Sequence, residues 1–152
     1  MNLTTTMTPT ATALIAEDEP LLAAGLAAEL ATHWPGLQIV ATVGDGASAV
    51  ERALALQPDV CFFDIRMPGM SGLEAAQALA EDWPDNSPFP LIVFVTAYEQ
   101  FALQAFEAQA VDYIVKPVDS ARVRACVQRL QRRLADRATK TPGSRRGSAQ
   151  VS

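Results

Sequence analysis

The sequence predicts an α/β fold in which helices cover both faces of a five-stranded parallel sheet. Five short apolar runs recur along the chain: TALIA (12–16), LQIVAT (37–42), DVCFF (59–63), LIVFV (91–95) and YIV (113–115). Segments with helical spacing, rich in Ala, Leu, Glu, Gln and Arg, follow them at about 19–33, 46–57, 72–82, 99–109 and 119–138. Strands without polar alternation are typical of a parallel sheet buried on both faces, and right-handed crossovers then place helices on each side. The pattern indicates five βα units in a doubly wound sandwich.

Helix boundaries are marked in turn along the chain. The Pro-Gly pair at 35–36 closes the first helical region, and Asp45 can cap the start of the second helix. Thr96 and Glu99 match a T-x-x-E capping box at the start of the fourth helix. Asp119 can cap the fifth. These signals agree with the periodicity.

Length and composition predict one folded domain. The 152 residues are 49% hydrophobic, without an apolar run of membrane-helix length or a signal-peptide pattern near the start. We therefore expect a cytoplasmic protein with no membrane partner. We expect a flexible N-terminus at 1–11, the domain at 12–138, and a flexible basic tail or linker at 139–152. Cys61 and Cys126 occupy apolar positions, and we interpret both as small core residues.

Charge is distributed unevenly along the chain. Residues 1–119 contain 16 acidic and 3 basic residues, whereas residues 120–152 contain 9 basic residues and one acidic residue. An acidic body has no basic patch with which to neutralise nucleic-acid phosphates. Any contact with DNA therefore belongs to another part of the protein.

Four of the five predicted strands end in a group that can take part in chemistry. Glu17 and Asp18 follow the first strand, Asp64 the third, Thr96 the fourth and Lys116 the fifth. Each has an ordinary explanation alone, as a first-turn acid, a turn acid, a helix cap or a strand-end lysine. Ligands of open α/β sheets bind outside the carboxyl ends of the strands, so their co-occurrence at one edge favours a shared site.

Clustered carboxylates point to a divalent cation and to phosphoryl transfer. A hard cation relieves the repulsion between such groups, and Mg²⁺ uses one or two carboxylates together with phosphate oxygens. With Asp18 and Asp64 on the metal, a phosphoryl donor can lie in line with a free Asp64 oxygen. Lys116 and Thr96 then neutralise charge on the equatorial oxygens. The sequence therefore predicts Asp64 as a nucleophile that forms an aspartyl phosphate.

At these residues the sequence resembles the receiver domain of bacterial two-component response regulators, across about residues 12–136. The motifs, in the family's order, are LIAEDEP, DVCFFDIRMPGMSGLE, VFVTAY and DYIVKPV. The resemblance implies a flavodoxin-like (βα)5 sandwich with strand order 2-1-3-4-5. It implies that a sensor histidine kinase phosphorylates Asp64 in the presence of Mg²⁺. It also implies a protein that is no metabolic enzyme and catalyses only its own phosphorylation and dephosphorylation.

The resemblance also implies a role for each residue of the metal site. Asp18, Asp64 and the backbone carbonyl of Arg66 would bind Mg²⁺. Glu17 stands where an Asp is commoner in the family, and its longer side chain favours support of the metal through a water molecule.

Further positions match the phosphoryl contacts and the switch of the family. Thr96 and Lys116 would contact the phosphoryl group, and Thr96 with Tyr113 would form the switch pair. Pro117 matches the family's cis proline. Arg66 and Tyr98 each lie two residues after a site residue, and we hypothesise that their bulk hinders the attacking water and prolongs the phosphorylated state.

The run TAYEQFALQAFEAQAVDYIVKPV resembles receivers attached to a LytTR-type (LytR/AlgR) DNA-binding output domain. No output domain is present in this chain, so a fragment of a DNA-binding regulator and a free-standing receiver both stay open. Apolar residues of the fourth helix spread over more than the ~100° stripe that one buried side requires. We therefore expect a homodimer through the fourth helix, fifth strand and fifth helix when the protein is phosphorylated.

Two other function classes compete with a phosphorylation switch. Phosphatases of the haloacid dehalogenase kind also use an aspartyl nucleophile with Mg²⁺, but they need a second acid at the position of Arg66. A stand-alone or phosphorylation-independent receiver would act as a protein interaction module. The intact set of Asp18, Asp64, Thr96 and Lys116 argues against a receiver that never accepts phosphate.

Overall fold

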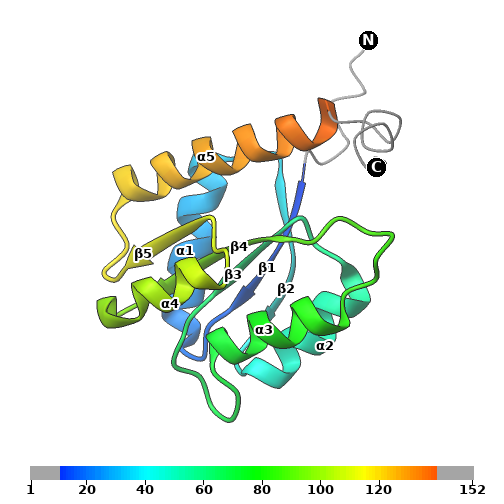
Figure 1. The fold of residues 1–152 in the computed structure, drawn as a ribbon. Helices are drawn as coiled ribbons and strands as arrows, with labels where there is room; N and C mark the ends of the chain where they lie inside the picture. Colours follow the sequence, from blue (N-terminus) through cyan, green and yellow to red (C-terminus); the bar gives the residue numbers. More distant parts are fainter. Residues whose placement is uncertain (1–10, 140–152) are drawn as a thin grey trace.

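The protein forms a three-layer α/β sandwich, seen in a computed structural model that describes residues 11–139 (Figure 1). The five strands are all parallel and lie in the order β2-β1-β3-β4-β5. Their bounds are β1 (Ala11–Ala16), β2 (Leu37–Val43), β3 (Val60–Phe63), β4 (Leu91–Thr96) and β5 (Asp112–Val115). The predicted fold class and strand order are confirmed.

Helices cover both faces of the sheet. The helices are α1 (Pro20–His33), α2 (Gly46–Leu56), α3 (Gly72–Asp82), the short 3-10 helix η2 (Glu99–Phe101), α4 (Ala102–Glu107) and α5 (Ser120–Thr139). Figure 1 shows α1 and α5 side by side on one face, with α2 and α3 on the other. Helix α4 lies on the second face, where the buried Ala105 belongs to the same hydrophobic cluster as side chains of β3 and β4.

Two hydrophobic clusters, one on each face, hold the sandwich together. Successive side chains of a strand point to opposite faces. In β3, Val60 and Phe62 accordingly belong to the cluster under α1 and α5, whereas Cys61 and Phe63 belong to the one under α2, α3 and α4. Cys61 is fully buried, as is Cys126 on α5, so both cysteines are core residues as predicted.

Most predicted boundaries lie within one or two residues of the observed ones. Strand β1 and helix α5 include Ala11 and Thr139, each one residue beyond the predicted domain. The rest of the two predicted flexible ends, residues 1–10 and 140–152, lies outside the described residues. Among residues 11–139, no helix combines the length and apolar character needed to cross a bilayer.

The predicted capping residues are right at two helices and wrong at a third. Asp45 accepts a hydrogen bond from the Ser48 amide (2.7 Å) at the start of α2, and Asp119 accepts one from the Arg122 amide (3.2 Å) at α5. A capping box is present at α3, where Ser71 and Glu74 bond each other's backbone amides at 3.1 and 2.9 Å.

The capping box predicted at Thr96 and Glu99 does not form. Thr96 ends β4 with no exposed surface, and its hydroxyl lies 3.4 Å from the Tyr98 amide, while Glu99 opens η2. The predicted helix 99–109 is therefore a 3-10 turn followed by the six residues of α4. Tertiary pairing of Thr96 with β5 overrides the local pattern, since the Lys116 amide donates to the Thr96 carbonyl at 2.8 Å.

Candidate functional site

The carboxyl edge of the sheet gathers the acidic side chains into one cluster. The Glu17 amide donates to the Val43 carbonyl (2.8 Å) and the Asp64 amide to the Ala16 carbonyl (2.9 Å), so the strand ladder continues to both acids. Glu17 and Asp64 are buried, and Asp18 is exposed. One carboxylate oxygen from each of the three lies within 4.8 Å of the others. Acids predicted at the ends of two separate strands, Glu17 and Asp18 after β1 and Asp64 after β3, thus form one cluster.

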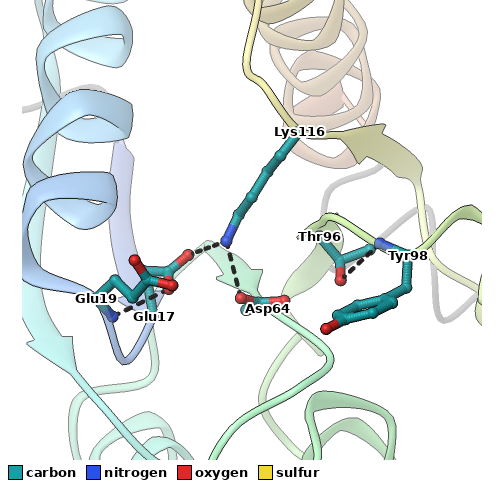
Figure 2. A network of polar contacts seen from close by, with 6 residues as sticks. All are labelled: Glu17, Glu19, Asp64, Thr96, Tyr98 and Lys116. Carbon is teal, nitrogen blue, oxygen red and sulfur yellow. Dashed lines mark hydrogen bonds and ion pairs between the residues drawn. The ribbon is translucent and has the colours of Figure 1, made fainter.

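Lys116 reaches into this cluster from the far side. Its Nζ lies 2.5 Å from Glu17 Oε1 and 2.9 Å from Asp64 Oδ2, and Figure 2 shows the ammonium between the two carboxylates. The lysine backbone is held by the bond from its amide to the Thr96 carbonyl, and the peptide bond to Pro117 is cis. The arrangement delivers one half-buried cation to two buried anions.

Electrostatics leave the cluster short of positive charge. Burial raises the pKa of Glu17, and the effect outweighs the hydrogen bond from Lys116 that would lower it. Burial alone would lower the pKa of Lys116, but its hydrogen bonds to Glu17 and Asp64 outweigh burial and raise it. Asp64 Oδ1 is buried without a hydrogen-bond partner among the described residues. Buried polar atoms seldom lack a hydrogen-bond partner.

Glycines shape the loop that follows Asp64. A Cβ at Gly72 would lie 2.0 Å from the Asp64 carbonyl oxygen, so the start of α3 packs directly on the backbone of the acid. Gly69 has φ +72°, a left-handed conformation that glycine adopts without steric cost. The motif PGMSG (68–72) therefore folds this loop tightly beneath Asp64.

Thr96 and Tyr113 lie beside the cluster and meet at Tyr98. The Thr96 hydroxyl accepts the bond from the Tyr98 amide, as Figure 2 shows, and the buried Tyr113 donates its hydroxyl to the Tyr98 carbonyl. Arg66 is exposed, and its Cζ lies 4.7 Å from the centre of the Tyr98 ring. Residues that the sequence singled out on three segments are thus in contact.

Residues 13–128 match the family model of the response regulator receiver domain. The chain belongs to this family.

Curated relatives of this receiver domain are longer than the chain. It is 45% identical over 128 residues to an uncharacterized response regulatory protein of Vibrio cholerae, an alignment of 84% of this chain and 48% of the relative. It is 38% identical over 118 residues to the transcriptional regulatory protein BtsR of Escherichia coli, covering 78% and 47%. The chain therefore spans about half the length of these relatives.

Solved structures agree with the family. The receiver (REC) domain of AraT, a response regulator from Geobacillus stearothermophilus, is 31% identical, with a TM-score of 0.75 over 84% of this chain and 98% of that one. The response regulatory domain of mrkE from Klebsiella pneumoniae is also 31% identical, with a TM-score of 0.74 over 82% and 98%. The receiver fold is therefore shared at nearly full length of those domains.

One side-chain contact in this receiver domain was not predicted from the sequence. The predictions for Arg66 concern its backbone carbonyl and its bulk, whereas its guanidinium lies on the Tyr98 ring. An arginine and a tyrosine, each two residues beyond a site residue on adjacent strands, were the available signal.

The cluster has the chemistry of a Mg²⁺ site. Its donors are carboxylate oxygens, the ligands that hard cations prefer, and one oxygen from each of the three acids lies close to the other two. Asp18 is exposed, so its side chain has room to turn toward an ion. The residues present therefore fit the cation.

Proposed function

We propose that Asp64 accepts a phosphoryl group from a sensor histidine kinase in the presence of Mg²⁺. The observation that carries this proposal is the Asp64 carboxylate itself, which has one oxygen held by Lys116 at 2.9 Å and the other without a partner. A nucleophile needs an oxygen that no hydrogen-bond donor occupies. The receiver domain, which we place at 12–138, would then be a regulatory switch.

The residues around Asp64 have separate tasks in this proposal. Asp64 Oδ1 attacks phosphorus while the nitrogen–phosphorus bond of the donor phosphohistidine breaks, and the imidazole leaves with the electron pair. The Lys116 ammonium moves from bridging two carboxylates to pairing with a phosphoryl oxygen, and the Thr96 hydroxyl donates to another. Charge that develops on the transferred group is thus neutralised by groups already within a side chain's reach.

Asp18 and Asp64 would hold Mg²⁺, with the Arg66 carbonyl as a third ligand and Glu17 acting through a water molecule. When bound, Mg²⁺ supplies positive charge against the phosphoryl oxygens. Support comes from the spacing of the three acids and from the raised pKa of Glu17, a buried carboxylate with too little cation nearby. Lys116 would give up part of its contact with Glu17 and Asp64 when the metal enters.

Phosphorylation would act through the switch pair on the face formed by α4, β5 and α5. Thr96 would follow the phosphoryl group, and Tyr113, which is buried with its hydroxyl on the Tyr98 carbonyl, would pack into the space left behind. The apolar side chains Leu103 (71% exposed), Phe106 (58%) and Val115 (41%) lie uncovered on α4 and β5. Such exposed apolar surface supports a homodimer at this face.

An output domain is the remaining part of the proposal. The chain spans about half of its curated relatives, and BtsR is named a transcriptional regulatory protein. We infer a DNA-binding output domain of the LytTR type, outside this chain, in a cytoplasmic regulator. A stand-alone or phosphorylation-independent receiver is the alternative, favoured only if the acceptor proves inert.

The deciding experiment is incubation with acetyl phosphate and Mg²⁺, followed by intact mass measurement. We expect one added phosphoryl group in the wild type, and none in Asp64→Asn or without Mg²⁺. Asp59→Asn, an acid at the opposite edge of the sheet, is the matched control and should be labelled like the wild type. An unlabelled wild type, or a labelled Asp64→Asn, would contradict the proposal.

A further inference from the structure

A recess of about 660 Å³ lies at the edge of the sheet away from the acidic cluster. Leu91, the first residue of β4, and Val111, just before β5, border it together with the loop between α3 and β4 and the last turns of α5. Thr96 and Lys116 lie at the other ends of the same two strands. The volume is within the roughly 300–1,000 Å³ of small-molecule sites. The recess is therefore large enough for a ligand and separate from Asp64.

Arginines of α5 bring positive charge to one side of the recess. Four of them, at intervals of seven, four and four residues, lie on the same side of the helix: Arg122, Arg129, Arg133 and Arg137. The first two form ion pairs with Asp112 at 2.5 and 2.9 Å. The last two border the recess, and among residues 11–139 neither forms an ion pair with a carboxylate. The row of arginines thus has its acid at the start and none at the recess.

Arg137 is the less exposed of these two arginines. Its Nη2 donates to the Phe89 carbonyl at 2.7 Å. Burial lowers the pKa of the guanidinium, the Asp59 charge opposes this effect, and the Arg133 charge adds to it. Asp59 already accepts hydrogen bonds from the amide (2.9 Å) and the hydroxyl (3.3 Å) of Thr12. A half-buried cation with a lowered pKa has less negative charge around it than an anionic ligand would supply.

A second polar group at the recess has no partner. Trp83 borders the recess with 9% of its surface exposed, and its buried indole Nε1 makes no hydrogen bond within the described part of the chain. Buried indole N–H groups usually have an acceptor. The Trp83 ring meets Phe89 edge-on at 5.5 Å and 77°, and Pro90 and Leu91 extend the apolar wall. An unused donor and an apolar surface therefore accompany the arginines.

Two acids, Asp85 and Glu107, also border the recess. Both are exposed to water, and neither is paired with the arginines of the recess in the described structure. They would repel a ligand that carries negative charge along its whole length. The arrangement favours one anionic group at the arginines and an uncharged remainder.

We propose that this recess binds a small organic anion, with a carboxylate for Arg133 and Arg137, an oxygen acceptor for the Trp83 N–H, and an apolar body against the rings of Trp83 and Phe89. Such a site would be a second input to the domain, distinct from Asp64. The inference does not depend on the proposed phosphorylation.

The two tryptophans of the chain provide the measurement. Protein labelled with ¹⁵N gives one indole N–H signal from Trp83 and one from Trp34, assigned with Trp34→Phe. The probes are 2-naphthoate and its uncharged counterpart 2-naphthamide. We expect naphthoate to move the Trp83 signal to saturation and to leave the Trp34 signal in place. Naphthamide should bind at least about ten-fold more weakly, because it lacks the charge-assisted hydrogen bonds.

Substitutions test the arginines separately. Arg137→Gln and Arg133→Gln should each raise the dissociation constant of naphthoate about three- to ten-fold. Arg133 is exposed, so its variant also tests the site if Arg137→Gln fails to fold. Arg124→Gln removes an exposed arginine near the start of α5 with the same change in charge, and it should bind like the wild type.

Three results would overturn the inference: a Trp83 signal that does not move to saturation, naphthamide that binds as tightly as naphthoate, or arginine variants of the recess that bind like Arg124→Gln. Asp64→Asn should bind naphthoate like the wild type. Failure at the recess would therefore leave the proposed function of Asp64 untouched, and an inert Asp64 would leave the recess untouched.

Discussion

Two buried aspartates at opposite edges of the sheet have very different surroundings. Asp112 opens β5, and Arg122 Nη2 (2.5 Å), Arg122 Nη1 (3.1 Å), Arg129 Nη1 (2.9 Å) and the Tyr113 amide (2.8 Å) donate to its oxygens. Asp64 follows β3, has one donor at 2.9 Å, and keeps one oxygen unpartnered. A saturated carboxylate is a structural group, whereas an unsaturated one beside other acids is poised for a ligand or a reaction.

The pKa values of Asp112 and of Glu17, the neighbour of Asp64 in the cluster, show the same contrast. Burial would raise the pKa of Asp112, but the Arg122 and Tyr113 hydrogen bonds and the charges of Arg122 and Arg129 outweigh it and lower the pKa. At the other edge, the effect of burial on Glu17 is larger than that of its hydrogen bonds, and its pKa is raised. The fold therefore stabilises negative charge at Asp112 and tolerates it at a cost beside Asp64.

The largest expected difference between the two regions is in phosphorylation rate. Lys116→Gln removes the only cation that forms an ion pair with Asp64 among the described residues. It should slow labelling by acetyl phosphate at least about 100-fold, as for other lost transition-state donors. Arg122→Gln removes the matched cation of Asp112 and should change the rate less than about three-fold. Rates come from intact mass against time. Equal slowing in both variants would show that the contrast reflects stability only.

The next difference concerns folding. Asp112→Asn leaves two arginines without their acceptor, and it should lower the free energy of unfolding by about 2 kcal/mol, because hydrogen bonds to charged groups are worth roughly 1.5–3 kcal/mol and these arginines are partly exposed. Asp64→Asn should change it by less than about 1 kcal/mol, since Lys116 keeps Glu17 and one repulsion between acids is lost. Urea unfolding in EDTA measures both, and a larger loss at Asp64 would reverse their assigned roles.

Much of the fold and the acceptor cluster could be predicted from the sequence because they depend on repeated patterns. Each buried strand is recognisable as a short run of apolar residues. The polar residues that follow four of these strands must lie at one edge of a parallel sheet. The Asp112 network was not predicted, since a single acid at a strand start acquires its partners only when α5 packs beside β5. The contact of Arg66 with Tyr98 depends on loop conformation, for which no spacing rule exists.

Asp112 and Glu17 should make opposite contributions to the pH dependence of stability, because the folded state lowers the pKa of one and raises that of the other. With its pKa lowered in the folded state, Asp112 contributes stability that is present above its unfolded pKa of about 3.9 and is lost as the pH falls through the folded value. The stability gap between the wild type and Asp112→Asn should therefore be constant near neutral pH and should shrink below about pH 4.

Glu17 should show the reverse, because its pKa is raised in the folded state. Its ionisation costs stability as the pH rises from the unfolded value of about 4.3 through the folded one. In EDTA, the free energy of unfolding of Glu17→Gln should therefore rise relative to that of the wild type as the pH increases between these two pKa values. Urea unfolding at several pH values gives both curves, and parallel curves for the two acids would remove the electrostatic contrast.

The smallest expected effect is the stabilisation by Mg²⁺. It should depend on the acidic cluster and not on the Asp112 network at the opposite edge of the sheet. Ion at ten times its dissociation constant should add about 1.4 kcal/mol to the free energy of unfolding of the wild type. Asp18→Asn and Asp64→Asn each remove one of the three clustered carboxylates and should lose most of this increment. Asp112→Asn, although less stable at the start, should keep the increment in full, because its network lies at the opposite edge and has no free oxygen to offer. Unfolding midpoints with and without Mg²⁺ test all three variants, and an increment that survives in Asp18→Asn and Asp64→Asn would place the ion elsewhere on the domain.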